Sequence, residues 1–193
     1  MTVRTAVIGC GKIAQMRHIP EFAANENAEL CALYDPTFSR AAQLAEQYGC
    51  RACTTIEELL ADPDIDAVSV CTANYVHAPI TVAALKAGKH VLCEKPMAVT
   101  IEECEEMVRT AKECGRYLMI AQNQRLAKAH VKARELIAGG AIGRILTFRT
   151  TFGHGGPEKW SINPGSSTWF FDKEKAAFGV MADLGIHKTD LIQ

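Results

Sequence analysis

The stretch "TAVIGCGKIA", residues 5–14, decides the fold of this chain. It begins as a short apolar run, typical of a buried strand, and continues at 9–14 as the pattern G-x-G-x-x-A. In such a turn the first glycine permits the tight bend, the second lets the backbone approach a pyrophosphate, and the small last residue allows close packing of helix on strand. The following helix presents its N-terminal N–H groups to an anion. We therefore expect a dinucleotide to be bound here by Gly9, Gly11, Lys12, Ile13 and Ala14.

The remainder of the first 122 residues alternates apolar runs with helical patterns, which is typical of a parallel α/β sheet. Further strands are expected at 28–35, 51–53, 66–72, 90–94 and 117–122. Two S/T-x-x-E sequences, beginning at Thr55 and Thr100, predict capping boxes at helix starts. We predict a doubly wound parallel sheet, a Rossmann domain, over residues 1–122.

An acidic residue, Asp35, ends the second strand 24 residues after Gly11. A carboxylate there accepts hydrogen bonds from the ribose hydroxyls of NAD and repels a 2′-phosphate, so we favour NAD. Arg40 lies close enough to meet that phosphate, which keeps NADP open; a solvated helix residue or a lid over adenine is the alternative. A methyltransferase glycine loop is a further alternative.

Ligands of open α/β sheets bind outside the carboxyl ends of the strands. The fourth strand ends in "CTANYVHAP" and the fifth in "CEKPM". A Lys–Pro bond can adopt cis at modest cost and so direct the lysine. His77 could instead lie at a helix N-terminus without a ligand role, and Lys95 could be a solvated lysine. We expect these residues at the cofactor site: Thr72, Asn74, His77, Glu94, Lys95, Gln122 and Asn123.

The pattern changes after residue 122. A helix is expected over 126–140, a long half-exposed strand over 143–153, a loop over 154–178 and a helix towards the end. A lone strand is marginal in water. We therefore interpret 123–193 as the start of an incomplete α+β substrate domain and expect a truncated chain. The apolar edge of the strand predicts self-association, hence a homo-oligomer.

Composition narrows the class of partner. With 21 basic and 22 acidic residues the formal net charge is −1, which indicates neither nucleic acid nor a membrane surface as a partner. No apolar stretch is long enough to span a bilayer and no signal peptide is recognisable, so a cytoplasmic protein is expected. Several of the eight cysteines lie in apolar runs, as expected of reduced thiols. The C-x-x-C at 50–53 leaves a redox or zinc role as an alternative.

Five elements, in order along all 193 residues, resemble the Gfo/Idh/MocA family of glucose-fructose oxidoreductase and inositol dehydrogenase. They are the glycine loop, Asp35, Glu94-Lys95-Pro96, the "QNQR" at 122–125 and the "DLGIH" at 183–187. The resemblance implies an NAD(P)-dependent oxidoreductase acting on a sugar or polyol. It also implies a catalytic group formed by Lys95, Asp183 and His187, with the nicotinamide against the E-K-P turn.

The chemistry of alcohol oxidation needs such residues. It moves a hydride to the nicotinamide and a proton to a base, and histidine titrates near neutral pH, so His187 is our choice of base. An ammonium such as Lys95 stabilises a developing alkoxide or shares the proton relay. Asp183 could orient the imidazole or hold a substrate hydroxyl. A metal pair or a helix-surface pair at Asp183 and His187 are alternatives, and a cofactor-binding protein without turnover is the rival function.

Overall fold

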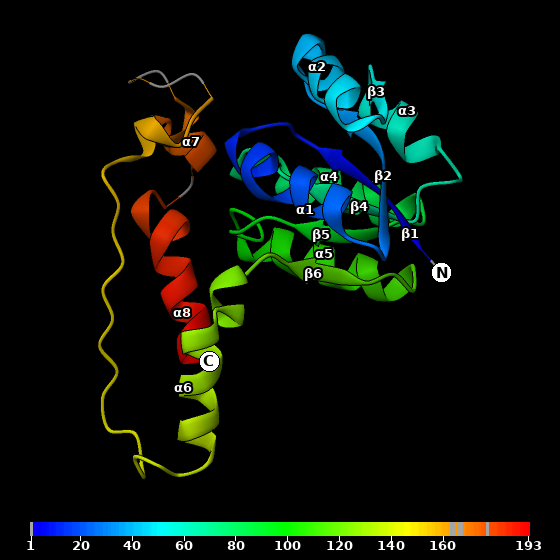
Figure 1. The fold of residues 1–193 in the computed structure, drawn as a ribbon. Helices are drawn as coiled ribbons and strands as arrows, with labels where there is room; N and C mark the ends of the chain where they lie inside the picture. Colours follow the sequence, from blue (N-terminus) through cyan, green and yellow to red (C-terminus); the bar gives the residue numbers. More distant parts are fainter. Residues whose placement is uncertain (1, 163–164, 166–167, 177) are drawn as a thin grey trace.

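The computed structural model describes residues 2–162, 165, 168–176 and 178–193. Its centre is one sheet of six parallel strands in the order β3-β2-β1-β4-β5-β6 (Figure 1). This order is that of the doubly wound dinucleotide-binding fold, so the predicted fold class is confirmed. The strands are β1 (Val3–Ile8), β2 (Ala28–Tyr34), β3 (Arg51–Cys53), β4 (Ala67–Val70), β5 (His90–Cys93) and β6 (Leu118–Ile120).

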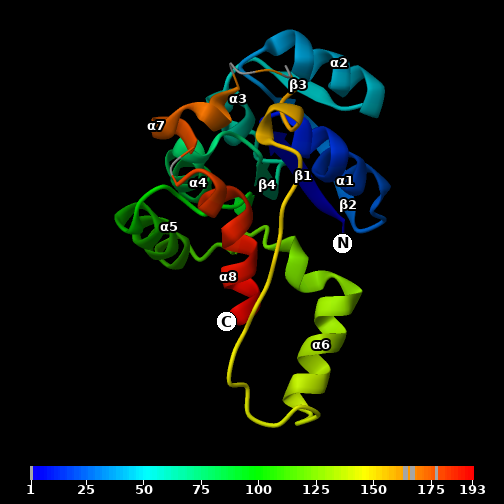
Figure 2. The same ribbon diagram turned by 90° about the vertical axis from the view of Figure 1, so that its left-hand side faces the viewer.

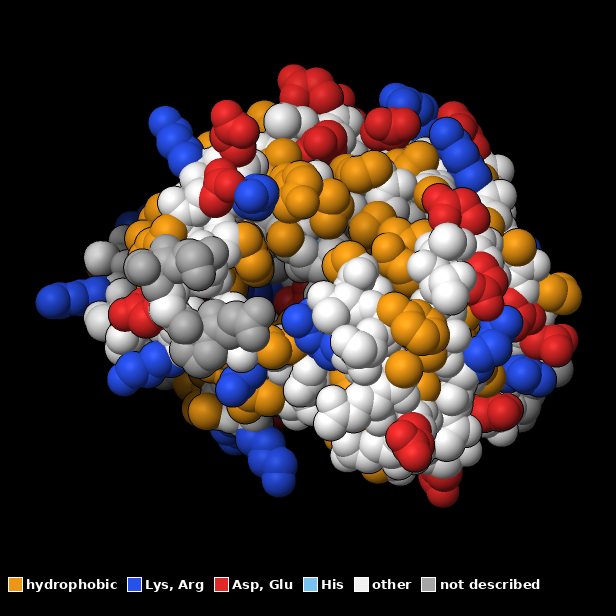
Figure 3. Space-filling view, turned by 90° about the horizontal axis from the view of Figure 1, so that it is seen from above, with side chains coloured by type: hydrophobic (Ala, Val, Ile, Leu, Met, Phe, Trp, Pro, Cys, Tyr) orange, Lys and Arg blue, Asp and Glu red, His pale blue; other side chains and the backbone are white. Residues whose placement is uncertain are grey.

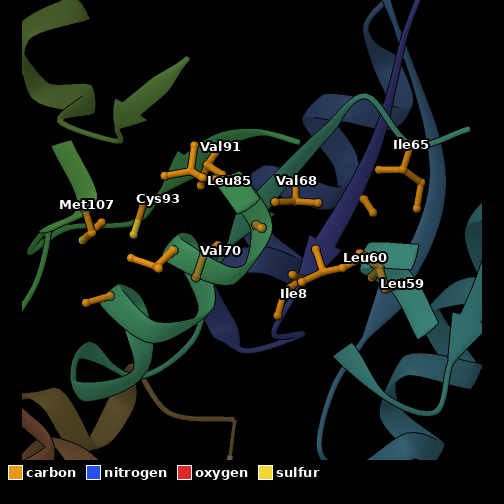
Figure 4. Packing of buried hydrophobic residues seen from close by; sticks show 14 of the residues in the cluster. Ile8, Leu59, Leu60, Ile65, Val68, Val70, Leu85, Val91, Cys93 and Met107 are labelled. Carbon is orange, nitrogen blue, oxygen red and sulfur yellow. The ribbon is translucent and has the colours of Figure 1, made fainter. Parts of the chain in front are cut away.

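Helices cover both faces of the sheet because successive strand residues point to opposite sides. Val7 packs in one cluster with residues of α1 (Ile19–Ala24) and α2 (Phe38–Tyr48). Its neighbour Ile8 packs in the other cluster (Figure 4). That cluster includes residues of α3 (Ile56–Ala61), α4 (His77–Lys86) and α5 (Ile101–Glu113). Each face thus has its own apolar core.

Strand register brings the carboxyl ends of the central strands to one edge. Ile8 pairs with both Tyr34 and Val70, and Val70 pairs in turn with Cys93. The residues that follow these four therefore meet at the same edge. They are Gly9, Asp35, Cys71 and Glu94.

Helix starts follow the predicted caps. At Thr100 both halves of the capping box form. At Thr55 the hydroxyl accepts the N–H of Glu58, whereas the Glu58 carboxylate accepts hydrogen bonds from Thr54 instead. The helix after the glycine loop carries a π-helical stretch at Ala14–His18 before α1.

The C-terminal part contains α6 (Lys128–Ala138), α7 (Lys173–Ala176) and α8 (Ile186–Ile192), with a π-helical stretch at Met181–Gly185 before α8. The expected strand at 143–153 is wrong: these residues are assigned to no strand. They form an exposed, extended segment that runs past α8 (Figure 2). A strand needs a neighbour to complete its ladder, and none of the described strands lies beside this segment.

None of the described helices is long and apolar enough to cross a membrane.

Candidate active site at the carboxyl edge of the sheet

Lys95 and Asp183 form an ion pair between the sheet edge and the C-terminal helix. The Lys95 ammonium donates to Asp183 Oδ1 and to the Asp183 carbonyl oxygen, each at 2.8 Å. The two side chains are only 18% and 21% exposed. Burial would raise the pKa of Asp183, but the charge and hydrogen bond of Lys95, followed by those of His154, lower it overall. Asp183 is therefore ionised at neutral pH and holds the ammonium in place.

His187 lies in α8, 7% exposed, with its ring edge-on to Phe152 at 6.0 Å. Its Nδ1 is buried and has no hydrogen-bond partner among the described residues. Burial lowers the pKa of His187, and the positive charge of Lys95 lowers it further. The imidazole is thus neutral at pH 7 and able to accept a proton.

From the sequence, Asp183 could orient the His187 ring or hold a substrate hydroxyl. In the described structure the Asp183 carboxylate is instead shared between Lys95 and His154, whose Nε2 lies 3.3 Å from Asp183 Oδ2. The π-helical turn that contains Asp183 is wider than an α-turn, so i, i+4 geometry does not hold across it. His154 was not identified from the sequence, since it lies in a glycine-rich loop without a recognisable motif.

The glycine loop is fastened to Asp35. The Cys10 N–H donates to Asp35 Oδ2 at 2.9 Å, and the Gly9 N–H donates to the Tyr34 carbonyl at 2.7 Å. Asp35 Oδ1 accepts from the Thr37 N–H and from Arg40 Nη1, both at 2.8 Å. The predicted acid and its neighbouring arginine are therefore side by side at the end of β2.

Gly9 and Gly11 meet different surroundings. A Cβ on Gly9 would lie 2.6 Å from the Cys71 carbonyl oxygen, and its φ of +96° belongs to the left-handed region that favours glycine. A Cβ on Gly11 would find that oxygen at 3.8 Å, an ordinary contact. The fold itself requires the first glycine, whereas the second is open for a ligand to approach.

Two of the residues after β4, Asn74 and His77, form hydrogen bonds to backbone carbonyls around the site. His77 is 1% exposed, and its two ring nitrogens lie 2.7 Å from the Pro96 carbonyl and 3.1 Å from the Thr72 carbonyl. Burial lowers the pKa of His77 despite these two acceptors. Asn74 donates its Nδ2 to the Ala176 carbonyl at 3.2 Å. Both side chains thus connect backbone segments around the site: His77 links the β4 loop to the E-K-P turn, where the Lys95–Pro96 bond is cis.

Four of the predicted cofactor residues line one groove of about 730 Å³ between the first helix, β6 and α8. They are Ile13, Glu94, Gln122 and Asn123. His18, which was not predicted from the sequence, also lines this groove and is hydrogen-bonded to Glu94. Seen from above, the surface is hollowed near its middle, with charged side chains of both signs in the hollow (Figure 3).

A nicotinamide dinucleotide fits the groups at this edge. Besides His187 Nδ1, the Oγ1 of Thr72 and the Oε1 of Gln122 are buried without a hydrogen-bond partner in the described structure. Such atoms are costly unless a ligand or water satisfies them. The glycine loop adds helix N-terminal N–H groups for a diphosphate.

The described structure offers no set of ligands for the metal sites considered at Asp183 and His187 or at the C-x-x-C of residues 50–53. Among the described residues, no group of three His, Cys, Asp or Glu side chains is placed to hold a metal ion. All eight cysteines, including the pair at 50 and 53, are free thiols. Burial raises the pKa of Cys50 to about 11, which favours the protonated thiol at neutral pH.

Residues 3–122 match the family model described as "Oxidoreductase family, NAD-binding Rossmann fold". The chain belongs to the Gfo/Idh/MocA oxidoreductase family. Residues 130–193 match the model of the "GFO/IDH/MocA C-terminal domain", so both parts of this Gfo/Idh/MocA chain lie within the family.

Two curated relatives act on sugars according to their names. The 1,5-anhydro-D-fructose reductase of Ensifer adhaerens is 37% identical over 98% of this chain and 55% of its own length. The D-glucoside 3-dehydrogenase of Escherichia coli is 34% identical over 97% of this chain and 52% of its own length. The chain therefore spans about half the length of the curated relatives it matches.

One solved relative was crystallised with a cofactor. KijD10, a 3-ketoreductase from Actinomadura kijaniata in complex with NADP and TDP-benzene, is 32% identical, with a TM-score of 0.70 over 75% of this chain and 45% of the other.

Proposed function

We propose that this protein transfers a hydride between a nicotinamide dinucleotide, NAD or NADP, and a secondary alcohol of a sugar or polyol. The observation that carries the proposal is the Lys95–Asp183 ion pair at the carboxyl edge of the sheet. It holds an ammonium at the same edge of the sheet as the glycine loop. Burial, followed by the charge of this ammonium, lowers the pKa of His187. The names of the relatives support the sugar-like substrate.

The residues of this chain have separable roles in that reaction. A bound nicotinamide ring supplies the acceptor or donor of the hydride, and the loop from Gly9 to Ala14, with Asp35, would hold the dinucleotide. Lys95 stabilises the negative charge that develops on the alcohol oxygen. His187, neutral at pH 7, accepts the hydroxyl proton. Asp183 fixes the direction of Lys95.

One pair of measurements distinguishes the proposed hydride transfer from the rival function, which is cofactor binding without turnover. NADH fluorescence is expected to report binding for the wild-type protein and for Lys95→Ala and His187→Ala. Reduction of NAD with a panel of polyols, inositols and sugars is expected for the wild type, with a loss of about 10² to 10⁴ in rate in each variant. If the protein binds NADH but no panel member reduces NAD or NADP, the hydride-transfer proposal fails and the non-catalytic function remains.

We further propose that the protein is cytoplasmic and a homo-oligomer. Eight free cysteines support the reducing compartment. The extended segment supports association because Ile145, Leu146 and Phe148 are 51%, 78% and 47% exposed on it.

A further inference from the structure

Three buried side chains from three separate elements form a hydrogen-bonded chain beneath Lys95. His18 ends the π-helical stretch after the glycine loop and is 9% exposed. Its Nδ1 lies 2.8 Å from Ser69 Oγ of β4, and its Nε2 lies 2.8 Å from Glu94 Oε1. The other oxygen of Glu94 accepts the backbone N–H of Lys95 at 3.1 Å. The chain thus ends at the residue that carries the ammonium.

Hydrogen positions in this chain follow from the chemistry of its members. Burial would raise the pKa of Glu94, but the hydrogen bond and charge of His18, followed by the charge of Lys95, lower it overall. An ionised Glu94 is a pure acceptor, so His18 Nε2 carries the hydrogen and donates it. The other ring nitrogen, Nδ1, is paired with the Ser69 hydroxyl, so every member of the hydrogen-bonded chain has a partner.

A serine, a histidine and a carboxylate in this order also describe a nucleophilic triad. Ser69 is 0% exposed in β4, one of the two central strands of the sheet, so no substrate atom reaches its hydroxyl. Ser69 therefore has a structural role in this hydrogen-bonded series. Only the other end of the series, at Lys95, lies at the proposed reaction site.

Removing His18 would leave the Glu94 carboxylate buried with one fewer donor. An unpaired buried carboxylate is strongly unfavourable, so it either takes up a proton or turns towards the nearest cation. Lys95, the next residue along the chain, is a candidate for that cation, and its charge already lowers the pKa of Glu94. Glu94 would then compete with Asp183 for Lys95 and disturb the pair that directs the ammonium.

We propose that His18 is a positioning residue that holds Glu94, and through it the backbone of Lys95, in the geometry that pairs Lys95 with Asp183. The role in catalysis rests on the proposed function, whereas the effect on the ion pair does not. Since His18 lies on the same helix as the glycine loop, it also links the dinucleotide loop to the lysine.

The first experiment measures the ion pair without turnover. Wild type, His18→Leu, His18→Gln and the control His90→Leu are labelled briefly with an amine-acetylating reagent at pH 8, and acetylation of Lys95 is quantified by mass spectrometry relative to Lys86. His90 is matched in chemistry but lies at the amino end of β5, where its Nδ1 accepts the Tyr117 N–H. Loss of a partly buried pair is expected to raise Lys95 labelling about three- to fivefold in His18→Leu. The glutamine, whose amide can donate to Glu94, should rescue most of this change.

Equal Lys95 labelling in His18→Leu and wild type, or an equal rise in His90→Leu, would overturn the proposal. If circular dichroism shows that His18→Leu is unfolded, the comparison of His18→Gln with His18→Asn decides. The shorter Asn side chain reaches Glu94 less well, so Lys95 should be acetylated more in His18→Asn. Equal acetylation of Lys95 in the two variants would count against the proposal.

The second experiment tests the catalytic consequence. His18→Leu is expected to lower kcat for the polyol reaction about tenfold, because the ammonium of Lys95 would no longer be held where it stabilises the developing alkoxide. An unchanged kcat in a variant with altered labelling would refute the catalytic part of the proposal. If even the wild type shows no turnover, the proposed function fails, and the labelling result still decides whether His18 positions Lys95.

Discussion

The two glycines of the dinucleotide loop should separate folding from ligand binding. In Gly9→Ala the new methyl group would lie 2.6 Å from the Cys71 carbonyl oxygen and 2.8 Å from its carbon. These are rigid backbone atoms at the end of β4, so the clash cannot be relieved by a rotamer change. The φ of +96° adds strain for any residue with a Cβ. Left-handed backbone costs about 1–2 kcal/mol and overpacking about 1–3 kcal/mol, so we expect a loss of about 2–5 kcal/mol.

Gly11→Ala is the matched control with the same chemical change two residues away. Its methyl group would meet the Cys71 oxygen at 3.8 Å, and its φ lies outside the left-handed region. We therefore expect its stability to stay within about 0.5 kcal/mol of wild type. The methyl group would instead stand where the backbone has to approach the diphosphate, so NADH binding should weaken about tenfold or more.

Two assays decide the matter. Urea denaturation followed by circular dichroism gives the free energy of unfolding, and NADH fluorescence titration gives Kd. For a chain of this size the loss in Gly9→Ala corresponds to a decrease in Tm of about 4–20 °C. Our reasoning would be refuted if Gly9→Ala were as stable as Gly11→Ala, or if Gly11→Ala bound NADH as tightly as wild type.

Three further outcomes are expected. Arg40→Ala should raise the Kd for NADPH about tenfold relative to that for NADH, because a guanidinium beside Asp35 is the available partner for a 2′-phosphate; an unchanged ratio in fluorescence titrations would contradict this. Since burial lowers the pKa of His77, its contribution to stability is present above pH ~6.5 and lost as the pH falls through the folded-state value. His77→Gln should therefore flatten the dependence of the unfolding free energy on pH below about 6.5, and an unchanged slope in urea titrations would argue against it. Phe148→Asp should reduce self-association in light scattering at high protein concentration, with Lys132→Asp on the exposed face of α6 as the control; a wild-type protein that is monomeric throughout would count against the homo-oligomer.

The sheet could be predicted from sequence because its determinants are local. Each strand is a short apolar run bounded by turn residues, and the glycine loop fixes which strand is first. Once the strands are parallel, their carboxyl ends share an edge, so the meeting of Gly9, Asp35 and Lys95 follows without knowledge of side-chain contacts.

The errors concern contacts that depend on distant chain segments. The segment 143–153 has a strand-like pattern, but pairing needs a partner strand, which a local pattern does not specify. His18 has no motif of its own, and its contact with Glu94 joins residues 76 apart in the sequence. The contact of Asp183 with His154 was not predicted for the same reason, because it joins two separate segments of the chain.

The ion pair of Lys95 with Asp183 is better explained by chemistry than by stability. Taking two charges largely out of water costs about as much as their attraction returns, so such a pair contributes little to folding. At this position, however, the charge of Lys95 lowers the pKa of Asp183, and burial, followed by the charge of Lys95, lowers the pKa of His187. One carboxylate is thereby kept charged and one imidazole neutral around a single ammonium. That combination, an oriented cation beside an unprotonated base, is what removal of a hydride and a proton from an alcohol requires.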